Sequence, residues 1–440
     1  MSAIATRFLQ EVTGWPRRVA LTLLFALTGS LVAVVFLLAT HAVYEWIFPA
    51  LARRPDWVFA VGSLAAITIS SLLVGLLLGK FMPSAAGSGI PQLKQAYRLD
   101  FGRLTWRGAW VKVLGGVISL GGGASLGREG PTVYASGAAA SALAGSLGVP
   151  QRQRMEAAAI GAAAGLAAAF NTPLAAITFV IEELADDLNS RHLGGAILAA
   201  VMGAFCTWAF VGRHPAFIVP PVDAVTWRSY VLTPVAAGLA AWVGILFQRR
   251  TLVLRDQVRR TTRLPLWLRP LMGGLAVWSL GLCVYLATRR LGVFSLGYAD
   301  LAAALDGSLA WQAGLMLLVA KLAATTLIYA WGGCGGIFAP TLFFGAMSGL
   351  VVAGASRQLG FHLGSDADLL LALVGMSACF GAVVRAPLTA LLIVFEMTHR
   401  YEIVPALMIG TVASQACARL FGGNRNFYDA ILEQDGVSIQ

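Results

Sequence analysis

A short stretch of the sequence, GGGASLGREGPT at residues 121–132, places an arginine and a glutamate between glycines inside a very apolar chain. A charged side chain at the centre of a membrane helix costs about 2.5–3.5 kcal/mol on insertion scales, so Glu129 is a candidate functional residue. The stretch is a Gly-rich turn that leads into an apolar helix, and N–H groups at a helix N-terminus attract anions without a full positive charge. The pattern therefore predicts an anion site with a carboxylate beside it.

The composition indicates that the rest of the chain lies in a membrane. Of the 440 residues, 58% are hydrophobic and 12% are charged, and the mean hydropathy is +0.75. A water-exposed globule cannot bury this much apolar surface, so we expect an all-α, polytopic integral membrane protein. A helix of about 20 apolar residues crosses a bilayer. Runs of this kind occupy residues 20–40, 57–79, 193–211, 230–247, 271–287, 309–331 and 403–420.

Shorter apolar segments, interrupted by Gly and Pro, lie between these runs at 113–150, 157–185, 336–356 and 368–397. A bend exposed to lipid would leave backbone N–H and C=O groups without hydrogen bonds, so broken helices belong in the protein interior or around a polar cavity. These broken, re-entrant segments therefore indicate a transport site.

The formal net charge of +11 comes with arginines beside the apolar runs. Arg7, Arg17 and Arg18 precede the first run, and six more arginines lie within 249–263. The positive-inside rule places both groups in the cytoplasm, which explains the charge without nucleic acid as a partner. We interpret the first run as a membrane helix rather than a signal peptide, because further spans follow it and it lacks a convincing cleavage site.

Metals and other cofactors are not expected. The five cysteines stand singly without CxxC spacing, and the five histidines form no HExxH pair. A remote alternative is an intramembrane serine protease with Ser125 of GGGAS as its nucleophile. Such a site needs a base within hydrogen-bond reach, and no histidine is paired with Ser125 by helical spacing.

The sequence also repeats itself. GREGPT at 127–132 aligns with GIFAPT at 336–341, an offset of 209 residues. Segment 161–183 aligns with 375–397 at an offset of 214, which pairs Gly161 with Gly375, Pro173 with Pro387 and Glu182 with Glu396. Repeats of this kind usually face each other across the membrane midplane, which favours an inverted repeat, although the alignment is also compatible with a parallel one.

Two homologous halves divide the chain into five expected parts. They are a cytoplasmic N-terminal segment 1–19, a first membrane repeat 20–212, a linker 213–228, a second membrane repeat 229–421 and a C-terminal segment 422–440.

Three Gly-rich motifs and one tyrosine carry a resemblance to a known family. They are GSGIP at 87–91, GREGP at 127–131, GIFAP at 336–340 and Tyr428 of NFYDAIL in the C-terminal segment. Their order and spacing resemble those of the CLC family of chloride channels and chloride/proton antiporters, over about 20–432. One such pentapeptide has little specificity, whereas three in register with the tyrosine are very specific. The resemblance implies that the broken helices of the two halves meet at a central anion site.

The resemblance also implies a role for the motif residues. By this resemblance, the hydroxyl groups of Ser88 and Tyr428 donate hydrogen bonds to a central chloride ion. The backbone N–H groups of Ile337 and Phe338 contact the same ion from the second half. Glu129 is the implied gating glutamate and external proton glutamate, which occupies the halide's position when ionised and swings away when protonated. Glycines let the backbone approach the ion, and prolines fit a first helical turn. The motif backbone comprises Gly87, Gly89, Pro91, Gly127, Arg128, Gly130, Pro131, Gly336 and Pro340.

Local alternatives remain for several of these residues. Ser88 could cap its own helix, and Tyr428 could anchor the chain at the membrane interface. Arg128 is interpreted as a structural or field-shaping charge rather than a ligand. Lys112 lies in an apolar run, where it either raises the positive potential of the pore or snorkels to the surface.

A second acidic residue bears on the choice between channel and antiporter. In FVIEELADD, Glu182 and Glu183 end an apolar helix, and such a pair is ordinarily a charged helix end. By motif spacing, Glu183 falls where the family's antiporters keep the internal proton-transfer glutamate. The resemblance therefore favours coupled chloride/proton antiport over a passive chloride channel. Ser88 favours chloride, since nitrate-preferring relatives tend to carry proline there and fluoride exporters depart from the GREGP and tyrosine pattern. Gln92 replaces an acid common in the family, outside the implied ion contacts.

Only twelve residues follow Tyr428, too few for the regulatory cytoplasmic domains of eukaryotic members. We therefore expect a multi-pass protein of the bacterial inner membrane, surrounded by lipid and without enzymatic activity. The resemblance implies a homodimer with one pore per subunit, and it implies chloride and protons as the transported ions.

Overall fold

The structure is a computed structural model that describes residues 14–185, 190–213, 215–220, 227–261, 263–364, 366–423 and 425–438. Within these ranges every regular element is helical, apart from two isolated bridges that pair Gly87 with Cys334 and Gly127 with Gly336. The expected all-α fold is confirmed. Residues 1–13 of the expected N-terminal segment, and 214 and 221–226 of the expected linker, lie outside the described residues.

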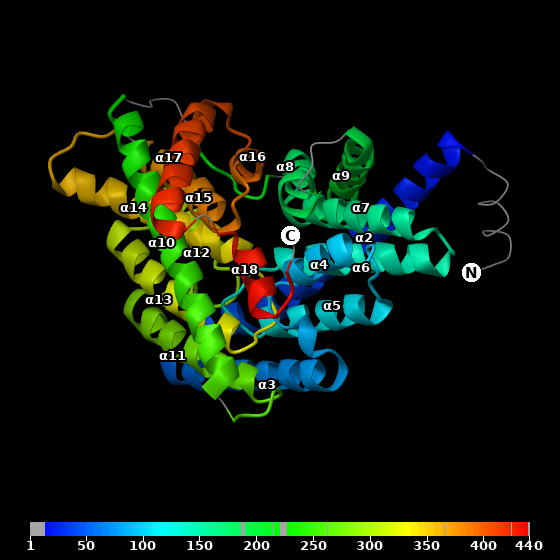
Figure 1. Ribbon diagram of the computed structural model, residues 1–440. Coiled ribbons are helices and arrows are strands. Elements are labelled where there is room, and N and C mark those ends of the chain that lie inside the picture. The colour runs from blue at the N-terminus through cyan, green and yellow to red at the C-terminus, as the bar shows by residue number, and fades with distance from the viewer. Residues whose placement is uncertain are drawn as a thin grey trace.

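Helices α2 to α9 form the first part of the chain (Figure 1). Their bounds are α2 Trp15–Ala52, α3 Asp56–Phe81, α4 Ile90–Leu99, α5 Trp106–Gly121, α6 Glu129–Ser146, α7 Gln151–Phe170, α8 Pro173–Phe179 and α9 Ser190–Phe210. A short 3-10 helix, Pro83–Ala85, precedes α4, and a π-helix, Val180–Ala185, continues α8.

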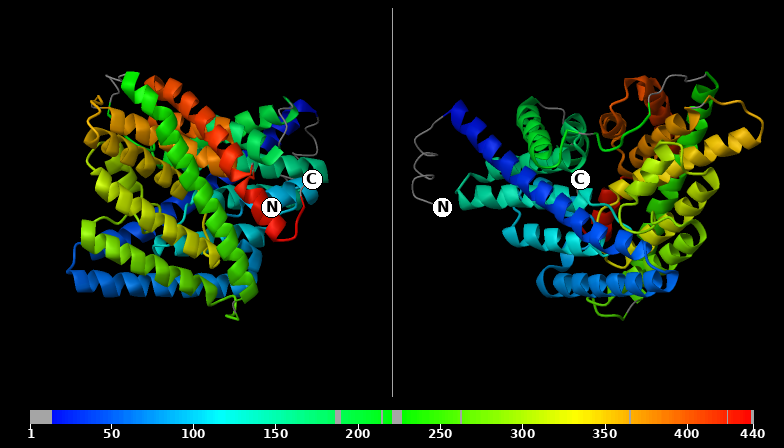
Figure 2. Two further views of the ribbon diagram at one scale, coloured as in Figure 1. Left: turned by 60° about the vertical axis from the view of Figure 1, so that its left-hand side comes forward. Right: turned by 180° about the vertical axis from the view of Figure 1, so that it is seen from behind.

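Helices α10 to α18 form the second part. Their bounds are α10 Trp227–Thr261, α11 Arg269–Thr288, α12 Tyr298–Leu305, α13 Trp311–Ala330, α14 Phe338–Gln358, α15 Ala367–Val384, α16 Pro387–Thr398, α17 Val404–Gly422 and α18 Phe427–Gln434. The two groups of helices lie largely side by side in Figure 1, with α3 of the first group packed against α11 of the second. Helix α18, drawn in red, lies between the groups beside α4 (Figures 1 and 2).

Nine helical stretches within the described residues are long and apolar enough to cross a membrane. Each of the seven predicted runs lies in a helix or extends past its ends by two residues at most: α2, α3, α9, α10, α11, α13 or α17. Large apolar side chains point outward from this shell; Val412 on α17, for example, is 72% exposed. Such a surface suits lipid, and helices satisfy their own backbone hydrogen bonds there. The protein is therefore integral to a membrane.

Each half breaks its buried helices at an equivalent place. Helix α7 ends before Asn171 and α15 ends before Arg385, and both residues have a left-handed backbone, with φ of 58° and 63°. Two residues later, Pro173 starts α8 and Pro387 starts α16. The residue before a proline avoids the helical conformation, so the chain must turn before each new helix begins. These breaks lie within two of the interrupted segments that the sequence predicts.

The innermost helices are lined with small residues that let two backbones approach closely. A Cβ atom at Gly161 on α7 would lie 2.5 Å from the backbone O of Ser136 on α6. In the second half, a Cβ at Gly375 on α15 would lie 2.0 Å from the backbone O of Gly345 on α14. Close approach of this kind is typical of helix packing in membranes. It gives the functional site a rigid support in both halves.

The two halves also contact each other reciprocally. Glu396 on α16 accepts hydrogen bonds from the backbone N atoms of Leu174 and Ala175, at 2.9 and 2.8 Å, at the start of α8. Glu182 accepts hydrogen bonds from two backbone N atoms at the start of α16, at 3.1 and 2.8 Å. Glu182 is therefore more than a charged helix end, because it binds the N-terminus of a helix in the other half.

A substitution at Gly375 tests the close approach of α14 and α15. The methyl group of Gly375→Ala would meet the backbone O of Gly345, which can move only if the helices separate. We expect the free energy of unfolding to fall by about 1–3 kcal/mol, measured by thermal unfolding in detergent. Gly238→Ala on α10 is the control, because a Cβ there meets nothing within 4 Å. Equal melting temperatures for the two variants would contradict the described packing.

Candidate anion and proton sites

The three Gly-rich motifs meet at one place inside the protein. The backbone N of Gly127 donates to Gly336 O at 2.7 Å, and the N of Gly336 donates back to Gly127 O at 2.6 Å. Gly87 is tied to the same region, because its N donates to Gly333 O at 2.9 Å and its O accepts from Gly335 N at 3.2 Å. The predicted convergence of motifs from both halves is thus present in the described chain.

Glycine is required where these backbones touch. A Cβ atom at Gly130 would lie 2.1 Å from Ser88 Oγ, and a Cβ at Gly336 would lie 2.9 Å from Gly130 N. Gly89 has a φ of 91°, in the left-handed region that favours glycine. Any side chain at Gly130 or Gly336 would therefore push the motifs apart.

Three helices begin at this junction with no side-chain cap. Helix α4 follows Gly89, α6 follows Arg128, and α14 follows Ile337. Pro91, Pro131 and Pro340 lie in their first turns. The first N–H groups of a helix carry partial positive charge, so the junction collects three positive helix ends. Ile337 and Phe338 start α14 and are fully buried.

Two buried hydroxyl groups lie at the site without a hydrogen-bond partner among the described residues. Ser88 is 1% exposed and Tyr428 is fully buried, and neither Ser88 Oγ nor Tyr428 Oη makes a hydrogen bond of normal length and angle. Ser88 does not cap α4, whose N-cap is Gly89, and Tyr428 is too deeply buried to anchor an interface. Both local alternatives are therefore wrong. A buried hydroxyl without a partner is costly, so each group has capacity for a ligand.

The Glu129 side chain is fully buried and lies against the start of α14. Its Oε1 accepts a hydrogen bond from Tyr298 Oη at 2.7 Å, and its Oε2 accepts one from Ala339 N at 3.4 Å. Arg128 lies beside it, with its Nε 3.9 Å from Glu129 Oε1 and its guanidinium over the ring of Tyr298. The carboxylate thus occupies a place at a helix N-terminus that suits a bound anion.

Two buried lysines hold the loops that precede α4 and α12. Lys112 Nζ donates to the carbonyl oxygens of Ala85 and Gly87 at 2.6 and 2.8 Å. Lys321 Nζ donates to two carbonyl oxygens of the loop 292–295 at 2.7 and 2.9 Å. Both lysines are fully buried, so the snorkelling alternative for Lys112 is wrong. Their ammonium groups bind the loops, and Lys112 thereby fixes the loop that carries Ser88.

Glu183 lies in the π-helix after α8, a distortion often found at functional sites. Its side chain is 1% exposed. Its Oε1 accepts a hydrogen bond from Lys94 Nζ at 2.9 Å, and its Oε2 accepts one from Asn426 Nδ2 at 2.7 Å. The Lys94 Nζ also lies 2.6 Å from Asp429 Oδ1. The carboxylate therefore points into the protein, unlike that of an ordinary helix end.

Aromatic side chains pack together near the elements that carry Glu129 and Glu183. The ring of Phe338, at the start of α14, lies 5.7 Å from the ring of Phe179 and 4.5 Å from that of Phe380, centroid to centroid. Phe179 is the last residue of α8, directly before the π-helix. The three rings therefore form an apolar cluster that joins the start of α14, where Glu129 lies, to the end of α8, which precedes Glu183.

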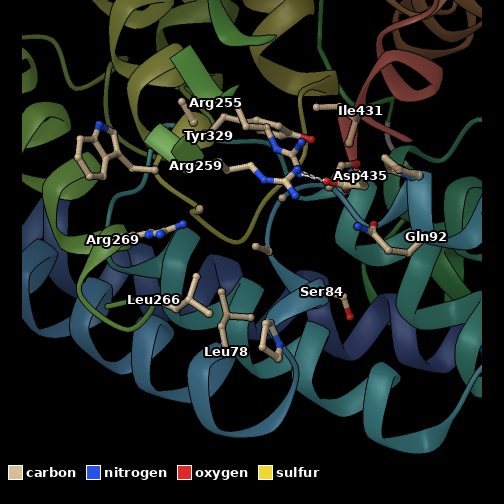
Figure 3. Close-up of a pocket in the computed structure, with 18 of the residues that line it drawn as sticks. Leu78, Ser84, Gln92, Arg255, Arg259, Leu266, Arg269, Tyr329, Ile431 and Asp435 are labelled. Carbon is tan, nitrogen blue, oxygen red and sulfur yellow. Dashed lines mark hydrogen bonds and ion pairs between the residues drawn. The ribbon is translucent and has the colours of Figure 1, made fainter. Parts of the chain in front are cut away.

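A cavity of about 430 Å³ reaches Ser88 from the side that carries the basic part of α10 (Figure 3). Arg255 and Arg259 of α10 and Arg269 of α11 line it. Arg255 Nη2 lies 2.8 Å from Asp435 Oδ1, and Arg259 pairs with the same carboxylate, as the dashed lines in Figure 3 mark. The cavity gives an anion a positively charged approach to Ser88.

Comparison with known proteins identifies the family. A family model described as voltage gated chloride channel matches residues 70–419. The chain belongs to this family. It is 32% identical over 437 residues to the H(+)/Cl(-) exchange transporter ClcA of Vibrio campbellii, covering 93% of this chain and 88% of that protein. The ClcA protein of Vibrio cholerae serotype O1 is 33% identical over 417 residues, with 92% and 86% covered. The family consists of transporters rather than enzymes. The alternative of an intramembrane serine protease with Ser125 as its nucleophile is therefore wrong.

Solved structures of the family share the fold. A slow cyanobacterial Cl-/H+ antiporter has a TM-score of 0.84 and 25% identity, and the match covers 96% of this chain and 99% of that one. A eukaryotic CLC transporter has a TM-score of 0.77 at 21% identity, with 95% and 74% covered. The fold expected from the resemblance is therefore confirmed.

Several residues of the site were not predicted from the sequence: Lys94, Tyr298, Lys321, Asn426 and Asp429. Lys321 follows Lys112 by 209 residues, the offset between the GREGPT and GIFAPT motifs, so comparing the two halves could have found it. An offset of 208 residues likewise pairs Gly89, which precedes α4, with Gly297, which precedes Tyr298 and has a φ of 75°. No sequence signal marks the other three, because their partners come from distant parts of the chain.

A substitution at Gly130 tests the contact between the first two motifs. The methyl group of Gly130→Ala would displace Ser88 Oγ, so we expect chloride affinity to fall roughly tenfold, the loss of about one charged hydrogen bond, measured by calorimetry. Adding Ser88→Gly would remove the closest clash without restoring the hydroxyl. The double variant should therefore regain thermal stability but not chloride affinity. Unchanged affinity in Gly130→Ala would show that Ser88 does not contact the anion.

Proposed function

We propose that the chain exchanges chloride for protons across the membrane, with Glu129 as the gate and external proton carrier. The observation that supports this most directly is the position of the Glu129 carboxylate at the start of α14. An ionised carboxylate is attracted to a helix N-terminus, whereas a protonated one is not. Protonation of Glu129 therefore vacates the position at the start of α14, and chloride and the ionised carboxylate occupy this position alternately.

The proposed central chloride site uses hydroxyl and N–H donors. Ser88 and Tyr428 supply buried hydroxyl groups that have no hydrogen-bond partner within the described part of the chain, and Ile337 and Phe338 supply the start of α14. The ammonium of Lys112 is bound to loop carbonyls, so its charge acts at a distance. A site made of dipolar donors holds an anion without trapping it, as conduction requires.

Glu183 is the proposed internal proton residue. Its buried carboxylate is held by Lys94 and Asn426, as expected of a group with a specific task rather than a solvated helix end. The relatives named above are chloride/proton exchangers by name, which supports antiport over the passive chloride channel. The channel alternative predicts chloride flux without proton movement.

The wider organisation is part of the same proposal. The segments 20–212 and 229–421 are proposed as inverted repeats, and the reciprocal contacts of Glu182 and Glu396 support a two-fold relation between them. The membrane is proposed to be a bacterial inner membrane, since the named relatives are bacterial. A homodimer with one pore per subunit is proposed from the family resemblance, and mass photometry of the purified protein tests it.

Purified protein in liposomes tests the proposed coupling, with chloride and pH followed together under a chloride gradient. We expect the native chain to move protons against their gradient. Glu129→Ala should give chloride flux that is independent of pH and moves no protons, because the anion place is then permanently open. Glu183→Gln should also abolish proton movement but retain chloride flux, because Glu183 lies off the anion path.

Two outcomes would contradict these assignments. If folded Glu129→Ala still drives protons uphill, Glu129 is not the gate. If the native chain shows chloride flux at the Nernst potential without proton movement, the protein is a channel.

The anion preference is tested at Ser88. Ser88→Pro removes the hydroxyl donor, so we expect the nitrate-to-chloride flux ratio to rise while the protein stays folded. Ser88→Ala is the control that removes the hydroxyl without restricting the backbone. Flux ratios equal to those of the native chain in both variants would remove Ser88 from the proposed site.

A further inference from the structure

Two charged side chains connect the buried Glu183 to the protein surface. Lys94 Nζ lies between two carboxylates, 2.9 Å from Glu183 Oε1 and 2.6 Å from Asp429 Oδ1. The exposed fractions of the side chains rise along this row, from 1% for Glu183 and 4% for Lys94 to 43% for Asp429. Of these three groups, only Asp429 has a substantially exposed side chain; its Oδ1, beside Lys94, is itself buried.

The exposed end of this row lies on the side that the positive-inside rule assigns to the cytoplasm. Asp429 is on α18, and Asp435, which directly follows that helix, pairs with Arg255 and Arg259. These arginines belong to the basic part of α10. Cytoplasmic segments of membrane proteins typically carry such an excess of basic residues. Water at Asp429 is therefore cytoplasmic water.

We propose that Asp429 is the cytoplasmic proton port of this transporter and that Lys94 passes protons between Asp429 and Glu183. The proposal rests on the proposed chloride/proton exchange and on Glu183 as its internal proton residue. The sequence motifs give no role to Asp429 or Lys94, and both are placed here by geometry alone.

The transfer balances in atoms and charge. A proton from water protonates the Asp429 carboxylate. The Lys94 ammonium then gives one N–H proton to Glu183 Oε1, and its nitrogen takes the O–H proton of Asp429. One N–H bond breaks and one forms, so Lys94 ends as an ammonium. The net result is one proton moved from Asp429 to Glu183, and the reverse order releases it to the cytoplasm.

The surroundings of the row suit a transferable proton. Two carboxylates and one ammonium carry a net charge of −1 when all are ionised, so one more proton neutralises the group. Arg98, one turn after Lys94 on α4, is a further cation near the row, and its Nε donates to Leu184 O at 3.5 Å. Because Lys94 pairs with two carboxylates at once, it stabilises the ionised form of each less than it would in a pair with one of them alone.

Asn426 holds the two ends of the row in register. Its Oδ1 accepts hydrogen bonds from the backbone N atoms of Tyr428 and Asp429, and so caps α18. Its Nδ2 donates to Glu183 Oε2 at 2.7 Å. One side chain therefore fixes both carboxylates relative to each other.

A neutral replacement of the port provides the first test. In liposomes, Asp429→Asn should lower the rate of proton movement roughly tenfold or more, because a general acid is removed. The rate should also lose its dependence on internal pH. Glu433→Gln, an exposed acid one turn further along α18, should behave as the native chain. Proton movement at the native rate and internal pH dependence in Asp429→Asn would overturn the proposal.

A conservative replacement separates a relay from a fixed ion pair. Lys94→Arg keeps the charge between the two carboxylates, but a guanidinium does not give up a proton in proteins. A fixed clamp therefore predicts native proton rates in Lys94→Arg, whereas the relay predicts a loss as large as that in Asp429→Asn. Native proton rates in Lys94→Arg would overturn the role of Lys94.

Further measurements distinguish a failure of the proposed port from misfolding and from a failure of the proposed chloride/proton exchange. Each substitution is repeated in a Glu129→Ala background, where chloride flux equal to that of Glu129→Ala alone shows a folded, open anion path. If the native chain moves no protons, or if Glu183→Gln moves them normally, exchange through Glu183 is the assumption that fails. If both behave as proposed and Asp429→Asn is unaffected, the port alone is wrong.

Discussion

Backbone polar groups at membrane depth must be satisfied inside the protein, and the loops before α4 and α12 meet this constraint with one buried lysine each. Lys112 and Lys321 bind the carbonyl oxygens of these loops at 2.6–2.9 Å. Carbonyl oxygens facing the site would repel an anion. Because the lysines hold them, the helix starts that follow can present N–H groups instead. On the proposed role of the junction, its preference for anions thus depends on two cations that bind the loops rather than the ion.

One kind of contact, a carboxylate on a helix N-terminus, serves both architecture and the proposed gate. Glu182 and Glu396 each accept two backbone N–H bonds at 2.8–3.1 Å and join the halves. From the facing helix α14, Glu129 accepts one backbone N–H bond, at 3.4 Å, and its shorter contact is with Tyr298. The structural glutamates are therefore held at two points by rigid backbone. Glu129 is held less firmly by the helix that it faces, as a group that must leave its place requires.

The sequence predicted what depends on local chemistry and repetition. The seven apolar runs, the breaks before Pro173 and Pro387, and the family are confirmed, because hydropathy, proline and glycine act through near neighbours. Glu182 was undervalued as a helix-end charge, since its partner lies in the other half. Lys94 and Asp429 were missed for the same reason. A polar residue acquires a task only when the fold brings a distant partner to it, and no spacing along the chain records that partner.

Helix α18 carries one residue of the proposed chloride site and one of the proposed proton path. Consecutive residues on a helix point about 100° apart, so neighbours can serve different surroundings. Tyr428 turns its unpartnered hydroxyl into the buried interior, while Asp429 reaches Lys94 and water. Both depend on the cap that Asn426 provides, and Asn426 also binds Glu183. A change in the charge of Glu183 therefore acts on the side chain that orients Tyr428. On the proposed roles, hydrogen bonds of Asn426 thus connect the proton residue Glu183 directly to the backbone of the chloride-site residue Tyr428. The proton path and the chloride site are therefore coupled through this side chain as well as through Glu129.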